Sequence, residues 1–198
     1  MLVLLVAAAA ATAVAVVLGQ RRGHSSSAPP PRNSVSLVGD SLNVGVEPYL
    51  QSALPGWTMH TDDEIGRPTA IGLEHLHAEQ STLAPYVVIS LGTNDAQSAV
   101  AAFEHAVDEA LALAGSHRCV VWLTVHRDGD AYEPFNAALR DLAARDENLR
   151  VVEWGRMVEQ HPSYLAPDGI HGSPDGYAAR TKAIVAAMRS CYDDGVVS

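Results

Sequence analysis

The sequence predicts an α/β fold in which one five-stranded parallel sheet carries helices on both faces. Short β-branched runs alternate with longer stretches of helical periodicity, which is typical of helices that cross over between parallel strands. Crossovers of this length indicate a doubly wound sheet. Without an apolar N-terminus and the linker after it, about 165 residues remain, which is enough for one core and too few for two.

The five strands are expected in the apolar, β-branched runs of the chain. They cover residues 35–38, 57–61, 86–91, 119–125 and 150–154. Reactive groups in such a sheet collect at the carboxyl ends of the strands, because the loops there vary while the core stays packed. Motifs that carry chemistry should therefore lie at this edge of the sheet.

The helices are expected between the strands and after the last one. They cover residues 44–52, 69–79, 96–114, 135–145 and 174–189. The helix over 69–79 should turn Ile71, Leu73 and Leu76 inward. The last helix has Pro174 in its first turn, where the missing N–H costs nothing, and Ser173 as its N-cap.

Residues 1–18 form an unbroken apolar run with one Thr, just long enough to cross a hydrocarbon core as a helix. We interpret residues 1–19 as a signal peptide or membrane anchor helix, 20–33 as a Ser/Pro-rich linker and 34–198 as the folded domain. Arg21 and Arg22 follow the apolar run, and the positive-inside rule would then leave the domain in the cytoplasm. A start codon assigned too far downstream would give the same pattern. From the position and length of the apolar run, we expect an extracytoplasmic domain, secreted or anchored to the membrane.

The net charge of the chain argues against one class of binding partner. The chain has 23 acidic and 13 basic residues and a formal charge of −10. Because such a surface repels phosphate backbones, we expect no nucleic-acid partner, and we expect a monomer.

Cys119 and Cys191 fit either one disulfide or two buried thiols, and the predicted fold places both at one edge of the sheet, where a bridge is geometrically possible.

Two polar motifs follow predicted strands. GDSL at residues 39–42 comes after the first strand, where Asp and Ser are also common helix caps, so the motif alone does not separate a cap from a nucleophile. GTND at residues 92–95 comes after the third strand. Its Asn94 can offer a side-chain N–H to a developing negative charge, although such turns are common in any protein.

The third motif, DGIH at residues 168–171, precedes the last helix. Asp168 can reach the ring of His171 from a tight turn and fix its tautomer, so that the other ring nitrogen can take a proton from a nucleophile. A lone DxxH also fits a metal-ligand pair or a surface turn. The chain has neither an HExxH nor a CxxC pattern, and His75 and His77 point away from each other on a helix, so we expect no metal site.

Taken together, the three motifs and a glycine after the second strand resemble the SGNH/GDSL hydrolases over residues 35–189. The resemblance implies a three-layer α/β/α sandwich with a flavodoxin-like strand order and no cofactor. It implies Ser41 as nucleophile, His171 as general base and Asp168 as the residue that orients the base. It also implies an oxyanion hole made of the backbone N–H groups of Ser41 and Gly66 and the side chain of Asn94.

Three further residues near these motifs are possible site residues, one as an oxyanion donor and two as substrate contacts. Gly72 competes with Gly66, but it falls inside a predicted helix where its N–H would be occupied, and an oxyanion donor must approach the substrate without a side chain in the way. Arg67 and His126 follow strands at the same edge, so both are candidates for contacting substrate.

The resemblance implies a serine esterase that cleaves carboxylic esters through an acyl-enzyme. Short connections without a lid predict an open, shallow site that accepts a small acyl group or an exposed polymer. With an export signal, the expected substrate is an acyl ester of an envelope glycan or lipid. Two alternatives stay open: an O-acyltransferase that uses the same triad with an alcohol in place of water, and a binding module on an inactive hydrolase scaffold.

Overall fold

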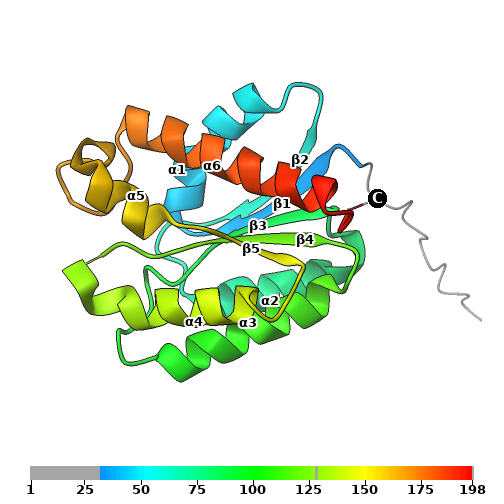
Figure 1. The fold of residues 1–198 in the computed structure, drawn as a ribbon, viewed down its shortest axis with the longest axis horizontal. Helices are drawn as coiled ribbons and strands as arrows, with labels where there is room; N and C mark the ends of the chain where they lie inside the picture. The colour runs from blue at the N-terminus through cyan, green and yellow to red at the C-terminus, as the bar shows by residue number, and fades with distance from the viewer. Residues whose placement is uncertain (1–31, 128, 198) are drawn as a thin grey trace, which may run out of the picture.

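Five parallel strands form one sheet in the order β2-β1-β3-β4-β5 in the computed structural model, which describes residues 32–127 and 129–197 (Figure 1). The strands are β1 (Ser34–Gly39), β2 (Thr58–Asp63), β3 (Tyr86–Ser90), β4 (Cys119–Leu123) and β5 (Leu149–Val152). Every neighbouring pair is parallel, so all the carboxyl ends meet at one edge. The predicted sheet and its flavodoxin-like order are confirmed.

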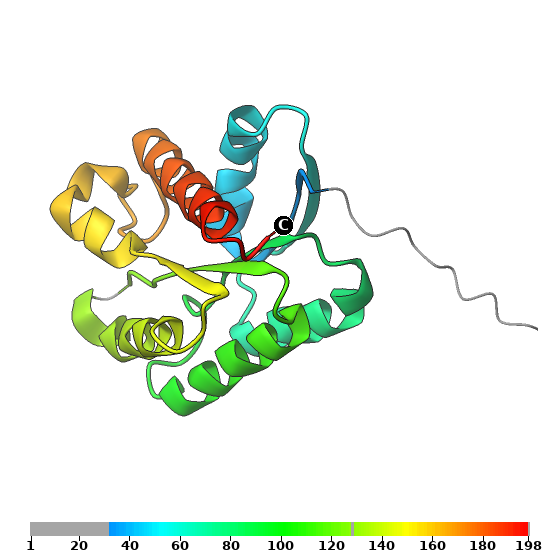
Figure 2. The same cartoon turned by 45° about the vertical axis from the view of Figure 1, so that its right-hand side comes forward.

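The helices cover both faces of the sheet. They are α1 (Ser41–Ala53), α2 (Thr69–Glu79), α3 (Val100–Ala114), α4 (Glu133–Ala143), α5 (Trp154–Gln160) and α6 (Pro174–Asp193), with short 3-10 helices η1 (Gln80–Thr82), η2 (Gly129–Tyr132) and η3 (Pro162–Tyr164). Helices α1 and α6 pack together on one face, and α2, α3 and α4 cover the other (Figures 1 and 2). This arrangement is the expected three-layer sandwich.

The sheet separates two apolar cores. Side chains of a parallel strand alternate between the faces, so Val87 of β3 packs among α2, α3 and α4, whereas Val88 packs against α1 and α6. Phe103 and Trp122 anchor the first core with their rings 5.7 Å apart and nearly perpendicular. Because both faces of the central strands are buried, the backbone that presents the carboxyl-edge loops is rigid.

Three helix starts differ from the prediction. Helix α3 begins at Val100, four residues after the expected start, and α4 begins at Glu133, two residues before it. Helix α1 begins at Ser41, three residues before the expected start, because the Asp40 carboxylate caps it and accepts the Leu42 N–H at 2.9 Å. Helix α5 was not expected. β5 ends at Val152, and Trp154, which was predicted to end a strand, is the first residue of α5.

Helix α2 also corrects one expected core residue. Leu76 is 1% exposed and Leu73 is partly buried, but Ile71 is 38% exposed. The buried positions of α2 are Thr69, Gly72 and Leu76, which fall on one helical stripe. Ile71 lies beside that stripe, about 100° around the helix from Gly72.

The two cysteines form a disulfide. Cys119 at the start of β4 and Cys191 near the end of α6 are bonded with Cα atoms 6.0 Å apart, and both side chains are fully buried. The predicted signal peptide or anchor, residues 1–19, and linker residues 20–31 lie outside the described residues. Among the helices that the structure describes, none is both long and apolar enough to cross a bilayer.

Candidate active site

Ser41, His171 and Asp168 meet at the carboxyl edge of the sheet. β1 delivers Ser41 as the first residue of α1, and the loop between η3 and α6 delivers the other two. His171 Nε2 lies 3.0 Å from Ser41 Oγ, and His171 Nδ1 lies 2.8 Å from Asp168 Oδ2. A hydroxyl, an imidazole and a carboxylate in this order can make the hydroxyl nucleophilic.

The Asp168 turn holds the carboxylate in its ionised form. Asp168 Oδ1 accepts the backbone N–H groups of Ile170 and His171, each at 2.9 Å. These bonds, together with the contact to the His171 ring, lower the pKa of Asp168 to about 2. Gly169 has φ +71°, which favours glycine and lets the turn close. The carboxylate therefore faces the ring as an acceptor throughout the neutral range.

Backbone contacts fix the loop that carries His171. The His171 carbonyl accepts the Ala166 N–H at 2.8 Å, and the Ser173 N–H donates to the Tyr164 carbonyl at 2.8 Å. At Gly176, a Cβ atom would lie only 1.9 Å from the Tyr164 oxygen, so only glycine allows α6 to start this close to the loop. Ser173 is the predicted N-cap, and its Oγ accepts the Gly176 N–H at 3.1 Å.

Two backbone N–H groups are available beside Ser41. The N–H groups of Ser41 and Gly66 donate to no acceptor within the part of the chain that the structure describes. Gly66 has φ +80°, and a Cβ there would have no atom within 4 Å, so its N–H is approachable. Its competitor Gly72 donates its N–H to the Pro68 carbonyl at 3.2 Å, as expected for a helical position.

Asn94 lies between the loops that carry Ser41 and Gly66. Its Nδ2 donates to Asp40 Oδ2 at 3.2 Å and to the Arg67 carbonyl at 3.3 Å. Both distances are at the long end for N–H···O bonds. An oxyanion bound beside Ser41 would compete with these two weak acceptors for the amide hydrogens.

Side chains that the sequence analysis missed hold the Asn94 loop. Arg127 Nη1 donates to the Thr93 carbonyl at 2.7 Å, and the Tyr132 hydroxyl donates to the Asp95 carbonyl at 2.8 Å. Asp95 Oδ1 accepts the Thr69 N–H at the start of α2 at 2.9 Å. Most of these contacts end on backbone groups, which leave no pattern in a single sequence.

Arg67, one of the two residues considered for substrate contact, has its guanidinium inside the protein. The side chain is 3% exposed, and Nη2 lies 2.7 Å from Asp62 Oδ1. Burial would raise the pKa of Asp62, but the hydrogen bonds from Arg67 and from His75 lower it. In this structure Arg67 therefore ties the Gly66 loop to β2, while its carbonyl meets Asn94.

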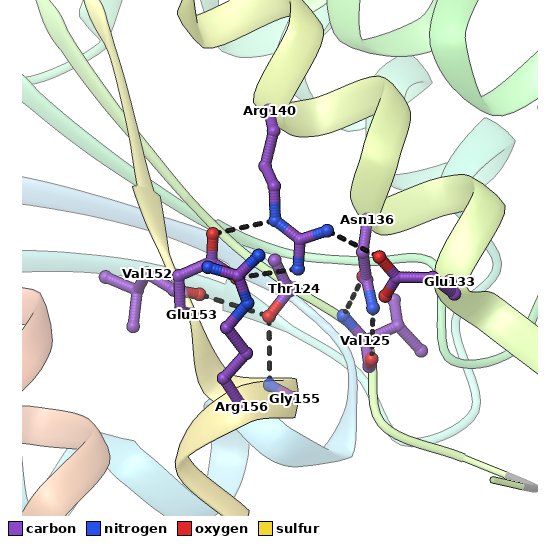
Figure 3. Close-up of polar contacts among 9 residues, drawn as sticks. All are labelled: Thr124, Val125, Glu133, Asn136, Arg140, Val152, Glu153, Gly155 and Arg156. Carbon is purple, nitrogen blue, oxygen red and sulfur yellow. Dashed lines mark hydrogen bonds and ion pairs between the residues drawn. The ribbon is translucent and has the colours of Figure 1, made fainter. Parts of the chain in front are cut away.

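His126, the other such residue, is half-buried in the loop after β4. That loop is clamped from both sides (Figure 3). Asn136 accepts the Val125 N–H at 2.8 Å and donates to the Val125 carbonyl at 2.9 Å, and Thr124 Oγ1 accepts the Gly155 N–H at 2.9 Å. The backbone directly before His126 is therefore held in place.

An ion-pair network lies beside this clamp (Figure 3). Arg140 Nε lies 2.8 Å from one oxygen of Glu153 and Nη2 lies 2.9 Å from the other, while Nη1 lies 2.6 Å from Glu133. The hydrogen bonds to Glu153 raise the pKa of Arg140. The network joins α4 to the residue that follows the carboxyl end of β5. Within the described ranges, no group of three or more His, Cys, Asp or Glu side chains is arranged to hold a metal ion.

Comparison with known proteins places the chain in a family. Residues 19–179 match the model of the GDSL-like lipase/acylhydrolase family. The chain is 30% identical over 160 residues to a putative peptidoglycan O-acetyltransferase of Bacillus subtilis, which covers 79% of this chain and 24% of that protein. It is 27% identical over 158 residues to a peptidoglycan O-acetyltransferase of Listeria monocytogenes, covering 76% of this chain and 23% of the relative. The chain thus spans about a quarter of the length of these relatives.

Solved structures share the fold. The C-terminal catalytic domain of a Streptococcus pneumoniae peptidoglycan O-acetyltransferase, solved with a methylsulfonyl adduct, superposes with a TM-score of 0.68 at 20% identity over 81% of this chain and 94% of that one. A psychrotrophic Pseudoalteromonas esterase inhibited by monoethylphosphonate gives a TM-score of 0.62 at 11% identity, over 81% of this chain and 99% of that one. At these identities the likeness concerns the arrangement of helices and strands.

Proposed function

Because the chain belongs to the GDSL-like lipase/acylhydrolase family, we propose that it moves acyl groups through a covalent ester on Ser41. The observation that carries the proposal is the 3.0 Å contact between His171 Nε2 and Ser41 Oγ. A serine hydroxyl is a weak nucleophile unless an adjacent base removes its proton. The Asp168 carboxylate, 2.8 Å from the other ring nitrogen, keeps that nitrogen protonated and leaves Nε2 free to act as the base.

The reaction begins when His171 takes the Ser41 proton as Oγ attacks the ester carbonyl. The carbonyl oxygen becomes an anion, which the N–H groups of Ser41 and Gly66 and the Asn94 amide stabilise. When the intermediate collapses, the ester C–O bond breaks and His171 returns the proton to the leaving alcohol. A second acceptor then attacks the acyl-enzyme, again with His171 as base, and Ser41 regains its proton.

The acceptor decides whether the enzyme is a hydrolase or a transferase. Water would release the free acid, and a sugar hydroxyl would receive the acyl group as a new ester. The curated relatives reported above are named as peptidoglycan O-acetyltransferases, which supports transfer of an acetyl group to a cell-wall glycan hydroxyl at least as well as hydrolysis. We therefore propose O-acetyl transfer on an envelope glycan as the physiological reaction, with ester hydrolysis as the competing outcome when water replaces the sugar.

We further propose that the domain works outside the cytoplasm. A buried disulfide between Cys119 and Cys191 is compatible with an oxidising compartment and uncommon in the cytoplasm. The apolar run at residues 1–18 would export or anchor the chain. Protease treatment of intact cells that express the full chain should degrade the domain if it is exposed, and leave it intact if it is cytoplasmic.

The function is tested with the full chain, p-nitrophenyl acetate as acetyl donor, and a soluble cell-wall glycan fragment as acceptor. Mass spectrometry follows the glycan, and p-nitrophenol absorbance follows donor cleavage. An O-acetylated glycan identifies a transferase, and donor cleavage with only free acetate identifies an esterase. The Ser41→Ala variant is the control for both signals. Failure of the unmodified chain to cleave the donor or to react with a fluorophosphonate probe would contradict the proposal and favour an inactive binding module.

A further inference from the structure

A charged side chain lies in the interior behind the candidate site. Arg180 of α6 is 1% exposed; its Nη2 donates to Ser90 Oγ at 2.7 Å, and its guanidinium lies over the Trp154 ring at 4.9 Å. Its Nε and Nη1 have no hydrogen-bond partner within the described residues. Because an ionised group buried in this way disfavours folding, and an apolar side chain of similar size would not, packing alone gives no reason for an arginine here.

A chain of contacts leads from Arg180 to the oxyanion site. Ser90 is the last residue of β3, and its carbonyl accepts the Asp40 N–H at 3.0 Å. Asp40 is fully buried, and its two carboxylate oxygens accept hydrogen bonds in different directions. Oδ1 accepts the Leu42 N–H at 2.9 Å, and Oδ2 accepts the Asn94 amide at 3.2 Å.

Asp40 holds both donors most strongly while it is ionised. Protonation places a hydrogen on one of its two oxygens and leaves a weaker acceptor for the two N–H groups. Burial raises the pKa of Asp40 to about 6, while the Leu42 N–H and the charge of Arg180 lower it. Burial therefore favours the neutral form of Asp40, and the charge of Arg180 favours the ionised form.

Arg180 is the fixed cation among the groups that face Asp40. These groups are Arg180 and Tyr177 from α6, and His171 from the loop before it. Burial lowers the pKa of Arg180 to about 10, so the guanidinium is still charged at neutral pH. Tyr177 is uncharged there, since burial raises its pKa above the ordinary value, and His171 exchanges its proton during the proposed reaction.

We propose that Arg180 is a positioning residue for acyl transfer: its buried charge keeps Asp40 ionised, so that Asp40 holds the Asn94 amide beside the nucleophile. The inference rests on the proposed function, because it assigns Arg180 a part in forming the oxyanion site. Removing the charge should release Asn94 as the pH falls and leave the site nearly intact at alkaline pH. A purely structural role would instead reduce activity by a similar factor at every pH.

The test compares full-chain variants across pH 5–9, with kcat for p-nitrophenyl acetate as the readout. Arg180→Met removes the charge and keeps an apolar side chain of similar length. The acid limb of its kcat–pH profile should move up by about one pH unit, which gives about a fivefold loss near pH 6 and little loss near pH 8.5. Arg180→Lys keeps the charge and should restore the original limb. Thr181→Val is the matched control, since Thr181 is the next residue of α6, is 4% exposed and also has an unpartnered polar atom.

Two further variants separate Asp40 from the other groups near Arg180. Asp40→Asn cannot ionise, so adding Arg180→Met to it should move the acid limb no further. A further shift in the double variant would show that Arg180 acts on another group and would overturn the inference. Ser90→Ala removes the bond that holds Arg180 Nη2, so the guanidinium is free to move away from Asp40 and a smaller upward shift is expected. This variant supplies the test if circular dichroism shows that Arg180→Met is unfolded.

The outcomes distinguish this inference from the proposed function. An active unmodified chain together with a folded Arg180→Met variant that keeps the original acid limb would overturn the role of Arg180 and leave acyl transfer standing. The same holds if Ser90→Ala is folded and unshifted where Arg180→Met is unfolded. An unmodified chain without esterase activity or fluorophosphonate labelling would overturn the proposed function, and the role of Arg180 with it.

Discussion

His171 Nε2 lies 3.0 Å from Ser41 Oγ although 130 residues separate the two in the chain. The topology explains the approach: β1 ends at the carboxyl edge where α1 begins, and α6 packs against α1 on the same face. The rings of Tyr49 and Tyr177 lie 6.0 Å apart across this pair of helices. A Cβ at Gly45 would lie 2.1 Å from the Tyr177 ring, so a glycine in α1 allows the helices to approach. The distance between nucleophile and base is thus set by helix packing.

Replacing Asp168 by Asn should remove most activity without disturbing the turn. The Asn oxygen can still accept the Ile170 and His171 N–H groups that Oδ1 accepts now, but its NH₂ group cannot accept a hydrogen bond from the His171 Nδ1–H. The imidazole then favours the wrong tautomer, and kcat should fall by about 10³- to 10⁴-fold. Asp175→Asn, at an exposed position in the first turn of α6, is the control. Steady-state kinetics with p-nitrophenyl acetate measures kcat for both variants. A kcat of Asp168→Asn within threefold of the value for the unmodified chain would contradict the prediction.

Gly66→Ala and Gly56→Ala form a matched pair. Both glycines have φ +80°, and a Cβ at either position would meet no atom within 4 Å. Each substitution should therefore lower the free energy of unfolding by a similar amount, about 1–2 kcal/mol, because alanine disfavours this backbone conformation. Only Gly66→Ala should also reduce kcat, since it alters a proposed oxyanion donor. Urea denaturation and kinetics measure the two effects, and an equal kcat in both variants would remove Gly66 from the oxyanion hole.

Most of the fold could be predicted from the sequence, but the helix boundaries could not. Alternating strands and helices predict the sheet because parallel pairing and crossover length follow from periodicity. The start of α1 lies three residues before the expected one because the GDSL motif fits a helix cap and a nucleophile alike, and Asp40 caps the helix directly before Ser41. Helix α5 has only 7 residues and begins with Trp154, a residue type that favours strands. Local preference therefore pointed the wrong way at that position.

Some residues of the candidate site could be predicted from the sequence, and others could not. The proximity of Ser41, Asp168 and His171 could be predicted, because the position of Ser41 after a strand and the spacing of Asp168 and His171 in one tight turn are visible in the chain. Arg180 was not predicted, because a lone arginine in a helix has no motif. The signal that was available is its spacing: Arg180 lies four residues before Ile184, and Ile184 lies four before Met188, on the buried stripe of α6. A charged residue on the buried stripe of a helix is rare unless it is paired.

Removing the disulfide should lower stability and spare the chemistry. Cys119 and Cys191 are separated by 72 residues, so the bond restricts the unfolded chain strongly, and its loss should cost about 2–5 kcal/mol. Cys119 lies at the amino end of β4, opposite the edge that carries Ser41. The double variant Cys119→Ala/Cys191→Ala should therefore keep its kcat at low temperature. Guanidinium denaturation of the variant and of the unmodified chain, with and without reductant, measures the difference; unchanged stability on reduction would show that the bond contributes little.

The carboxyl groups of Asp63 at the end of β2 and Glu47 in α1 predict a pH dependence of folding. Asp63 at the end of β2 accepts the Asn43 amide at 3.0 Å. Burial raises the pKa of Asp63 to about 8; the Asn43 bond lowers it, and the adjacent Glu47 raises it. In the unfolded chain the pKa of an aspartate is about 3.9. Between these values the folded protein binds the extra proton, so this group stabilises the fold below about pH 4 and loses its contribution as the pH rises to about 8.

Asp63→Asn should therefore flatten the stability profile on its alkaline side. For one proton the slope is at most about 1.4 kcal/mol per pH unit, and the variant should lack this fall between pH 5 and pH 8. Glu47→Gln should reduce the fall as well, because it removes the carboxylate that opposes ionisation of Asp63. Asp141→Asn, which removes a charge from an exposed position on α4, should keep the original slope. Urea denaturation at each pH gives the free energies of unfolding, and parallel profiles for Asp63→Asn and Asp141→Asn would show that Asp63 releases its proton in the ordinary carboxyl range.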